Sequence, residues 1–149
     1  MKSLFIKPDA DAILARVGTL TEDSQRQWGS LNVCQMLVHC RKGLKMALGE
    51  IRIRRTWIGL LLGRKYISLA TNDIPFRQGS PSAKGSIELI TEDFDIEKER
   101  LIHYIHKFCD GSKEGCTDNP HFFFGKLSPT QWGALMHKHL DHHLKQFGV

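Results

Sequence analysis

The segment that most constrains how this chain folds is SPTQWGALMHKHLDHHLKQFGV, at the end of the sequence. Ser128 can cap a helix, Pro129 suits the first helical position, and Gln131 can complete a capping box with the cap. Apolar side chains then recur at helical spacing, at Trp132, Leu135, Met136, Leu140, Leu144 and Phe147. The pattern predicts one amphipathic helix that runs to about Gln146 and ends near Gly148.

Two earlier segments also have the apolar spacing of helices. The first begins near Asp9 and extends, with breaks, to about Arg26. The second follows WGSLN, where Ser30 or Asn32 can cap it, because a short side-chain oxygen can accept from the free amides of the first turn. An apolar stripe that begins in VCQMLVHC continues this second helix as far as Gly49, which suits a helix end.

A third earlier helix is predicted to begin at Thr91, a capping residue followed by acidic residues that suit the positive end of the helix dipole. Its buried face is predicted at Phe94, Leu101, Ile102, Ile105, Phe108 and Cys109. Residues 50–90 are predicted to form a long crossover connection, with a short helix and a loop rich in Pro, Gly and Ser. We therefore expect residues 1–149 to form one all-α domain, a four-helix bundle with a long crossover between its second and third main helices.

Composition and charge limit the class of protein. The chain has 149 residues, 41% hydrophobic and 25% charged, which is typical of a soluble globular domain. The net charge of +5 weakly favours an anionic ligand and gives poor support for nucleic acid, since no recognition motif accompanies it. The sequence has no signal-peptide pattern, and its longest apolar run, WIGLLLG, is too short to cross a bilayer. We expect a cytoplasmic protein with reduced cysteines and without a nucleic-acid or membrane partner.

A basic stretch, IRIRRTWIGLLLGRKY, surrounds this apolar run with the cations Arg52, Arg54, Arg55, Arg64 and Lys65. The interpretation that we favour is a buried connector with solvated flanks. The alternatives are a surface that gathers an anionic substrate or cosubstrate, a membrane-surface contact, and a nucleic-acid site. Membrane contact is less favoured because the apolar run is short and no second anchor is evident.

Four of the eight histidines lie between His137 and His143 in the predicted last helix, and they do not share one face. At about 100° per residue, His139 and His143 fall within the apolar stripe, whereas His137 and His142 fall on its flanks. The opposite side carries Lys138, Asp141 and Lys145. Two imidazoles four residues apart can chelate one metal ion. They can equally be core polar groups that hydrogen-bond to neighbours, and the pair alone leaves both interpretations open.

A third imidazole is available at His39, within the predicted second helix. It lies on the flank of the apolar stripe, where it can face a neighbouring helix as a ligand or bond to a backbone or carboxylate group. His103 and His106 are expected in solvent. His121 precedes the last helix and can reach the mouth of a site or pack among the phenylalanines beside it. Asp141 points away from the histidine face, so the sequence offers no obvious general base.

Two stretches, WGSLNVCQMLVHC and NPHFFFGKLSPTQWGALMHKHLDHHLKQFGV, resemble the DUF1569 family within the DinB/YfiT-like superfamily of metalloenzymes. The resemblance implies a four-helix bundle in which His39, His139 and His143 hold one divalent ion, and such nitrogen ligands suit zinc or nickel. It also implies open positions for a water, which would become a hydroxide nucleophile, or for the thiolate of a low-molecular-weight thiol. Gln146 can orient a ligand or a histidine without binding the ion itself, or it can be a polar residue at a helix end.

Three functions are in competition. The first, which we favour, is a metal-dependent hydrolase or thiol-dependent S-transferase that acts on a small molecule, by analogy with the superfamily alone. The second is a non-catalytic bundle with a vestigial metal site that acts through partner binding or as a homodimer. The third is an anion or nucleic-acid binder that works through residues 52–65, and steep salt dependence of binding would support it.

Overall fold

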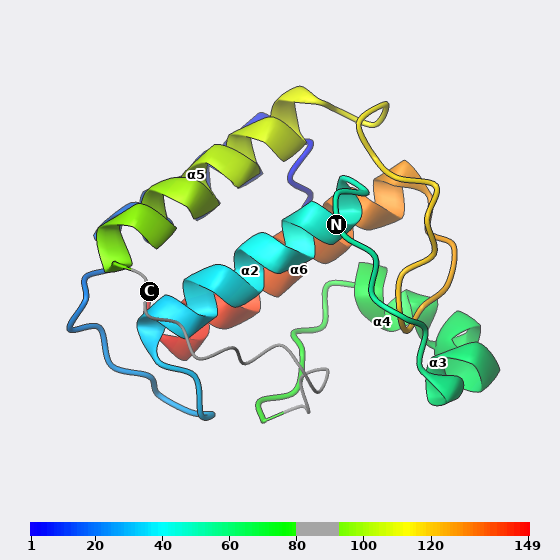
Figure 1. The fold of residues 1–149 in the computed structure, drawn as a ribbon, viewed down its shortest axis with the longest axis horizontal. Helices are drawn as coiled ribbons and strands as arrows, with labels where there is room; N and C mark the ends of the chain where they lie inside the picture. The colour runs from blue at the N-terminus through cyan, green and yellow to red at the C-terminus, as the bar shows by residue number, and fades with distance from the viewer. Residues whose placement is uncertain (80–92) are drawn as a thin grey trace.

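The computed structural model describes residues 1–79 and 93–149, and within these ranges the chain is all-α, as predicted (Figure 1). The α-helices are α1 (Lys7–Thr19), α2 (Val33–Ala47), α3 (Trp57–Leu62), α4 (Ile67–Thr71), α5 (Phe94–Asp110) and α6 (Pro129–Gln146), and a 3-10 turn, η1 (Gly63–Tyr66), joins α3 to α4. Among the described residues, extended pairing is confined to one isolated bridge between His121 and Gly125.

The four long helices pack around a shared apolar core. α2 contacts α5 and α6 (Figure 1). α1 contacts the same two helices, so each long helix has two long neighbours. Each contributes side chains with almost no exposure, for example Ile13, Leu37, Ile105 and Leu140. Removal of such apolar surface from water is the main favourable term in folding. The contact between α2 and α6 places side by side the two helices that carry the candidate ligands.

The caps of α2 and α6 explain where these helices begin. Ser128 Oγ accepts from the Gln131 N–H, and the Gln131 side chain accepts from the Ser128 N–H. At α2, Asn32 and Gln35 make the same reciprocal pair, so Asn32 rather than Ser30 is the cap. Each capping box satisfies two backbone amides that would otherwise lack partners at the helix start. The predicted last helix is confirmed from its cap to its end at Gln146.

Two other helices have boundaries that differ from the prediction. α1 ends at Thr19 rather than near Arg26, because the next residue adopts an extended backbone with ψ 141°. α5 begins at Phe94, where the Asp93 carboxylate accepts from two amides of the first turn. The predicted cap, Thr91, lies outside the described residues.

The buried face of α5 is largely the predicted one, with a charged residue added. Its buried apolar members are Phe94, Leu101, Ile105 and Phe108, while Ile102 and Cys109 are half-buried at its edge. Glu97 lies on the same face and is 0% exposed. Its carboxylate pairs with Arg41 of α2 at 2.8 Å and with Arg100 at 2.6 Å. Paired cations are what allow a carboxylate to be buried at such a position.

The described part of the connection between α2 and α5 holds α3, η1 and α4, and the apolar side chains of α3 face outward. Trp57 and Leu61 are each 71% exposed, so the interpretation of residues 52–65 as a buried connector is wrong. The physical reason is that Gly59 and Gly63 occupy the inner side of α3 and η1, where the backbone of the loop before α6 leaves no room for a side chain. In the part of the chain that the structure describes, no helix has both the length and the apolar character needed to cross a membrane.

Candidate metal centre

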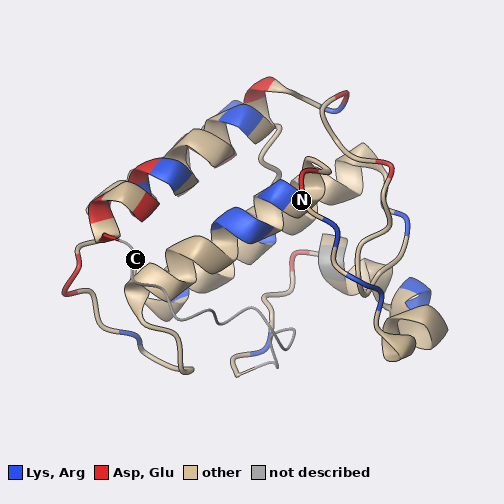
Figure 2. Cartoon of the chain, viewed as in Figure 1, with Lys and Arg blue, Asp and Glu red and all other residues tan. Residues whose placement is uncertain are grey.

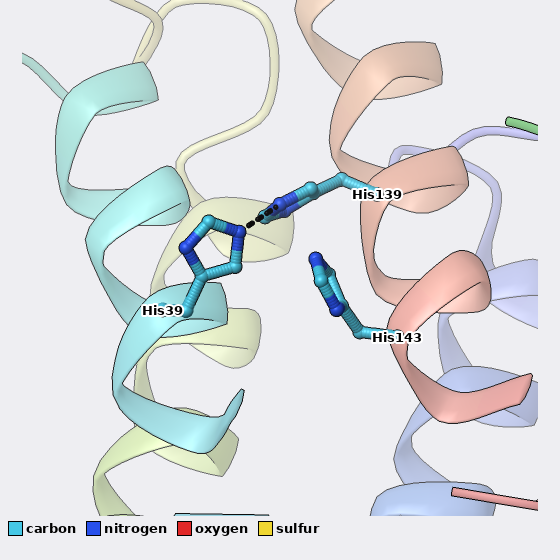
Figure 3. A group of neighbouring side chains, drawn as sticks. All are labelled: His39, His139 and His143. Carbon is cyan, nitrogen blue, oxygen red and sulfur yellow. Dashed lines mark hydrogen bonds between the residues drawn. The ribbon is translucent and has the colours of Figure 1, made fainter. Parts of the chain in front are cut away.

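Three histidines converge at the interface between α2 and α6. His39 of α2 and the pair His139 and His143 of α6 point toward one another (Figure 3). The ring centroid of His39 lies 4.8 Å from that of His139 and 4.7 Å from that of His143, and the two α6 rings are 4.8 Å apart. One nitrogen of each ring lies within 4.8 Å of one nitrogen of the others. Within residues 1–79 and 93–149, no other set of three or more His, Cys, Asp or Glu side chains has such a geometry.

His39 and His139 form the closest pair, with their Nε2 atoms 2.9 Å apart (Figure 3). At this separation one N–H donates a hydrogen bond to the other nitrogen, or the lone pairs of both nitrogens face a shared ion. His139 fits against α2 because Gly43, one turn after His39, has no side chain. A Cβ at Gly43 would lie 3.2 Å from His139 Nδ1, closer than most real Cβ contacts. Gly43 thus makes room for the ring.

Gln146 fixes the orientation of His143. Its Oε1 lies 2.9 Å from His143 Nδ1, and its Nε2 donates to the Trp28 carbonyl at 2.8 Å. A carbonyl oxygen can only accept, so the amide nitrogen of Gln146 must face Trp28, and Oε1 must accept from an Nδ1–H. His143 is therefore held in the tautomer whose Nε2 carries a free lone pair, and this atom faces the other two rings (Figure 3).

The loop between α1 and α2 makes this arrangement possible. Gly29 has φ +81°, a left-handed conformation that favours glycine, and a Cβ there would collide with Gln146 Nε2. The Gln27 N–H also donates to the Gln146 carbonyl at 2.7 Å. The loop thereby hydrogen-bonds to the end of α6 and holds the Gln146 side chain against His143.

Burial keeps the three imidazoles neutral. Together with the charges of Lys42 and His142, it lowers the pKa of His39 to about 4. Burial also lowers the pKa of His143 to about 3, and with the neighbouring histidines it holds the pKa of His139 well below its ordinary value. The cause is that burial removes the water that stabilises a charged imidazolium. At neutral pH the cluster therefore presents lone pairs, the form that binds metals.

The predicted flanking histidine His142 lies beside the cluster, outside the three-histidine group. Its ring centroid is 5.2 Å from that of His143 and 5.9 Å from those of Trp28 and Phe76. His142, Trp28 and Phe76 line part of a cavity of about 70 Å³. Asp141, on the same cavity, bonds to Arg16 and Lys145 and, as predicted, takes no part in the cluster.

The remaining histidines have other surroundings. His121 is buried in the loop before α6, where its Nδ1 accepts from the amides of Phe123 and Phe124 at 3.1 Å each. It thus stabilises that loop, and of the two interpretations of the sequence, packing is the one that the structure supports. His103 and His106 are exposed on α5, as predicted.

Fold and cluster together define a class of protein: an all-α chain with three neutral, inward-facing histidines at a helix interface. The sequence model of the family described as "Protein of unknown function (DUF1569)" matches residues 2–148. The chain therefore belongs to the DUF1569 family. Comparison with curated proteins gave no significant match, and neither did comparison with solved structures.

Proposed function

We propose that this protein binds a divalent metal ion within a four-helix bundle of the DinB/YfiT type, with His39, His139 and His143 as ligands. The observation that carries the proposal is the convergence of three imidazoles, each with one nitrogen within 4.8 Å of the others. Three histidines with further positions left open are a known donor set for catalytic ions. The order of the ligands, one from the second long helix and two from the last, supports the assignment to this type of bundle.

The donor atoms fit a metal ion in their protonation as well as in their positions. Gln146 fixes the tautomer of His143 that presents Nε2. His139 Nδ1 is buried and has no hydrogen-bond partner among the described residues, an arrangement that costs about 1–3 kcal/mol. With the proton on Nδ1, the Nε2 lone pair of His139 is available to an ion shared by the three rings.

Zinc or nickel is the ion that we propose, because neutral imidazoles suit both. When bound, the ion would supply Lewis-acid chemistry toward a water or a small thiol at its open positions. The chain itself positions the ligands, keeps them unprotonated and, through Gln146, holds His143 in one orientation. We propose hydrolysis, or transfer of a low-molecular-weight thiol, with a small-molecule substrate. A cytoplasmic setting would keep the cysteines reduced.

A second candidate is a bundle without catalysis, in which the cluster is a structural remnant and the protein acts through a partner or as a homodimer. One observation favours it: His39 Nε2 and His139 Nε2 lie at 2.9 Å, so one ring can donate to the other with no ion present. In that case chelators would change neither composition nor stability.

Metal content decides between the two candidates. Tag-free protein, purified without chelators, would be measured by plasma mass spectrometry before and after soaking with zinc or nickel. We expect near-stoichiometric metal, and a loss of about tenfold or more in occupancy for His139→Ala, since the remaining rings form an incomplete site. His103→Ala, an exposed histidine on α5, is the matched control and should keep its metal. Wild-type protein that contains no metal and regains none would favour the structural remnant.

The role of Gln146 is tested separately. Gln146→Ala should keep one ion per chain but weaken zinc affinity by about 10–100-fold, the usual cost of removing a group that orients a ligand histidine. Competition with a chromogenic chelator measures this affinity. Gln25→Ala removes an exposed glutamine from the loop between α1 and α2 and serves as the control. Equal affinities of the two variants would show that Gln146 acts only at the helix end.

A further inference from the structure

The outer side of α3 and η1 exposes large apolar side chains next to cations. We name Trp57, Leu60, Leu61, Arg64 and Lys65 the α3 patch. Trp57 and Leu61 are each 71% exposed, and Leu60 is 60% exposed. Arg64 and Lys65 are exposed in the turn that follows. Contiguous apolar surface of this kind, rimmed by charge, marks an interaction site more often than isolated exposed leucines do.

The outward orientation of these side chains is built into the packing. A Cβ at Gly59 would lie 2.7 Å from the Phe123 carbonyl oxygen, and one at Gly63 would overlap the same atom. Thr56 caps α3 by accepting from the Gly59 N–H, and its own N–H donates to the Phe122 carbonyl at 3.1 Å. The glycine side of α3 is therefore docked on the loop before α6. If α3 turned its leucines toward the protein, their side chains would have to fit against the Phe123 backbone, where Gly59 and Gly63 now lie.

The charged residues in the segment that carries the patch have one sign. Residues 51–72 contain Arg52, Arg54, Arg55, Arg64 and Lys65, and they contain no Asp or Glu. Figure 2 shows Lys and Arg on the strand-like segment that enters α3 and on the turn that leaves it. Cations beside exposed apolar side chains complement a surface in which anionic groups cover an apolar layer.

We propose that the α3 patch docks on an anionic lipid surface, with the tryptophan and leucines in the headgroup boundary and the cations on lipid phosphates. The short apolar run was the reason to expect no membrane contact. Peripheral docking does not require a spanning helix, however, and Ile74 at 67% and Leu69 at 45% exposure supply further apolar surface nearby in the chain. A two-fold contact with a second copy is less suitable, because it would bring the same cations face to face. The proposal is independent of the histidine cluster.

Vesicle co-sedimentation tests the proposal on the full chain. Vesicles of phosphatidylcholine and phosphatidylglycerol in equal parts should sediment the protein at low salt, and phosphatidylcholine alone should not. Raising NaCl to about 0.5 M should weaken binding, because the screening length shrinks. Trp57 provides a second readout. It is 71% exposed, whereas Trp28 is half-buried and Trp132 is 0% exposed, so a blue shift of emission on binding reports mainly the transfer of Trp57 out of water.

Matched variants separate the two parts of the patch. Arg64→Gln with Lys65→Gln should lower the partition coefficient by about 30-fold, since each cation near an anionic surface contributes about fivefold. Arg26→Gln with Lys113→Gln removes two exposed cations outside the patch and should have a far smaller effect. Leu61→Ser should abolish the blue shift while leaving the melting temperature unchanged, because its side chain is exposed.

Three results would overturn the proposal: no sedimentation with anionic vesicles, an unshifted Trp57 emission in their presence, or equal loss of binding for the two charge-variant pairs. A dimer in analytical ultracentrifugation that Leu61→Ser dissociates would instead assign the patch to a second copy. Failure of vesicle binding together with saturable binding of an acidic peptide would assign it to a protein partner.

Discussion

The interface between α2 and α6 contains imidazole rings, where a helix interface usually has apolar side chains. The outer side of α3 exposes apolar side chains, where a protein surface usually has polar ones. His39 and His139 are brought within 2.9 Å of each other inside the protein. Leu61, although apolar, is 71% exposed. In both regions a glycine decides the outcome. Gly43 leaves room for the His139 ring, and Gly63 lets the backbone of the loop before α6 occupy the place of a side chain.

The comparison teaches that side-chain polarity alone does not set orientation in this molecule. Close backbone approach, made possible where a residue lacks a Cβ, determines which side of each helix is inside. The interior of α2 is also charged on its other flank, where Arg41 reaches Glu97. Arg41 pairs with Glu97 and His143 pairs with Gln146, as buried polar groups require, whereas His139 Nδ1 has no hydrogen-bond partner among the described residues. The apolar groups of α3 have no such constraint and are free to meet an external surface.

The largest effect is expected where an interior charge loses its partner. Glu97→Ala should lower the free energy of unfolding by about 3–5 kcal/mol, because it leaves the mostly buried Arg41 without its carboxylate. Urea denaturation followed by circular dichroism measures the change. Glu99→Ala, at an exposed position on the same helix, should change stability by no more than about 0.5 kcal/mol. Similar values for the two variants would mean that the buried pair contributes nothing to the fold.

A leucine pair tests the apolar half of the comparison directly. Leu140→Ala, at a site 1% exposed in α6, should destabilise by about 2–5 kcal/mol through lost burial and a new cavity. Leu61→Ala makes the same chemical change on α3 and should cost no more than about 0.5 kcal/mol, because the side chain is already in water. A large loss for Leu61→Ala would contradict the outward orientation of α3.

A pH titration of the metal-free protein tests the interior histidines. Burial lowers the pKa of His121 and of His143 to about 3 from the ordinary 6.5. Between these values the unfolded chain binds more protons than the folded one. Stability is therefore complete above about pH 6.5 and falls as the pH drops toward 3, by about 1.4 kcal/mol per unit for each such histidine.

Urea midpoints at pH 7.5 and 5 measure this slope. His121→Phe should reduce it by the share of one histidine, whereas His103→Ala, which changes an exposed ring, should leave it intact. A slope that is the same in wild type and in His121→Phe would show that His121 titrates alike in the folded and unfolded chain.

Local rules explain what could be predicted. The cap of α6, its apolar stripe and the inward placement of His139 and His143 all depend on residues within a few turns of one another. His39 was predicted on the flank of its helix, from where it does reach α6. Glu97 was missed among the acids of a first turn, although its spacing from Leu101 places it on the buried face.

Contacts between distant segments explain the rest. The outward face of α3 depends on Phe123, some sixty positions further along, whose backbone meets Gly59 and Gly63. Likewise, the hydrogen bond from Gln146 to Trp28 requires the left-handed backbone at Gly29. Neither pairing leaves a periodic signal in the sequence, because nothing near one partner indicates the position of the other.

The sequence separation of the histidines also bears on how the chain reaches its native state. His139 and His143 share one helix, but His39 is 100 positions away from His139. Closing a loop of that length has an entropic cost, and the packing of the four long helices on one another offsets it. A chain with α6 formed and α2 undocked has two of the three rings. Capture of an ion by all three nitrogens would therefore report that long-range docking is complete, and ion release would be an early sign of unfolding.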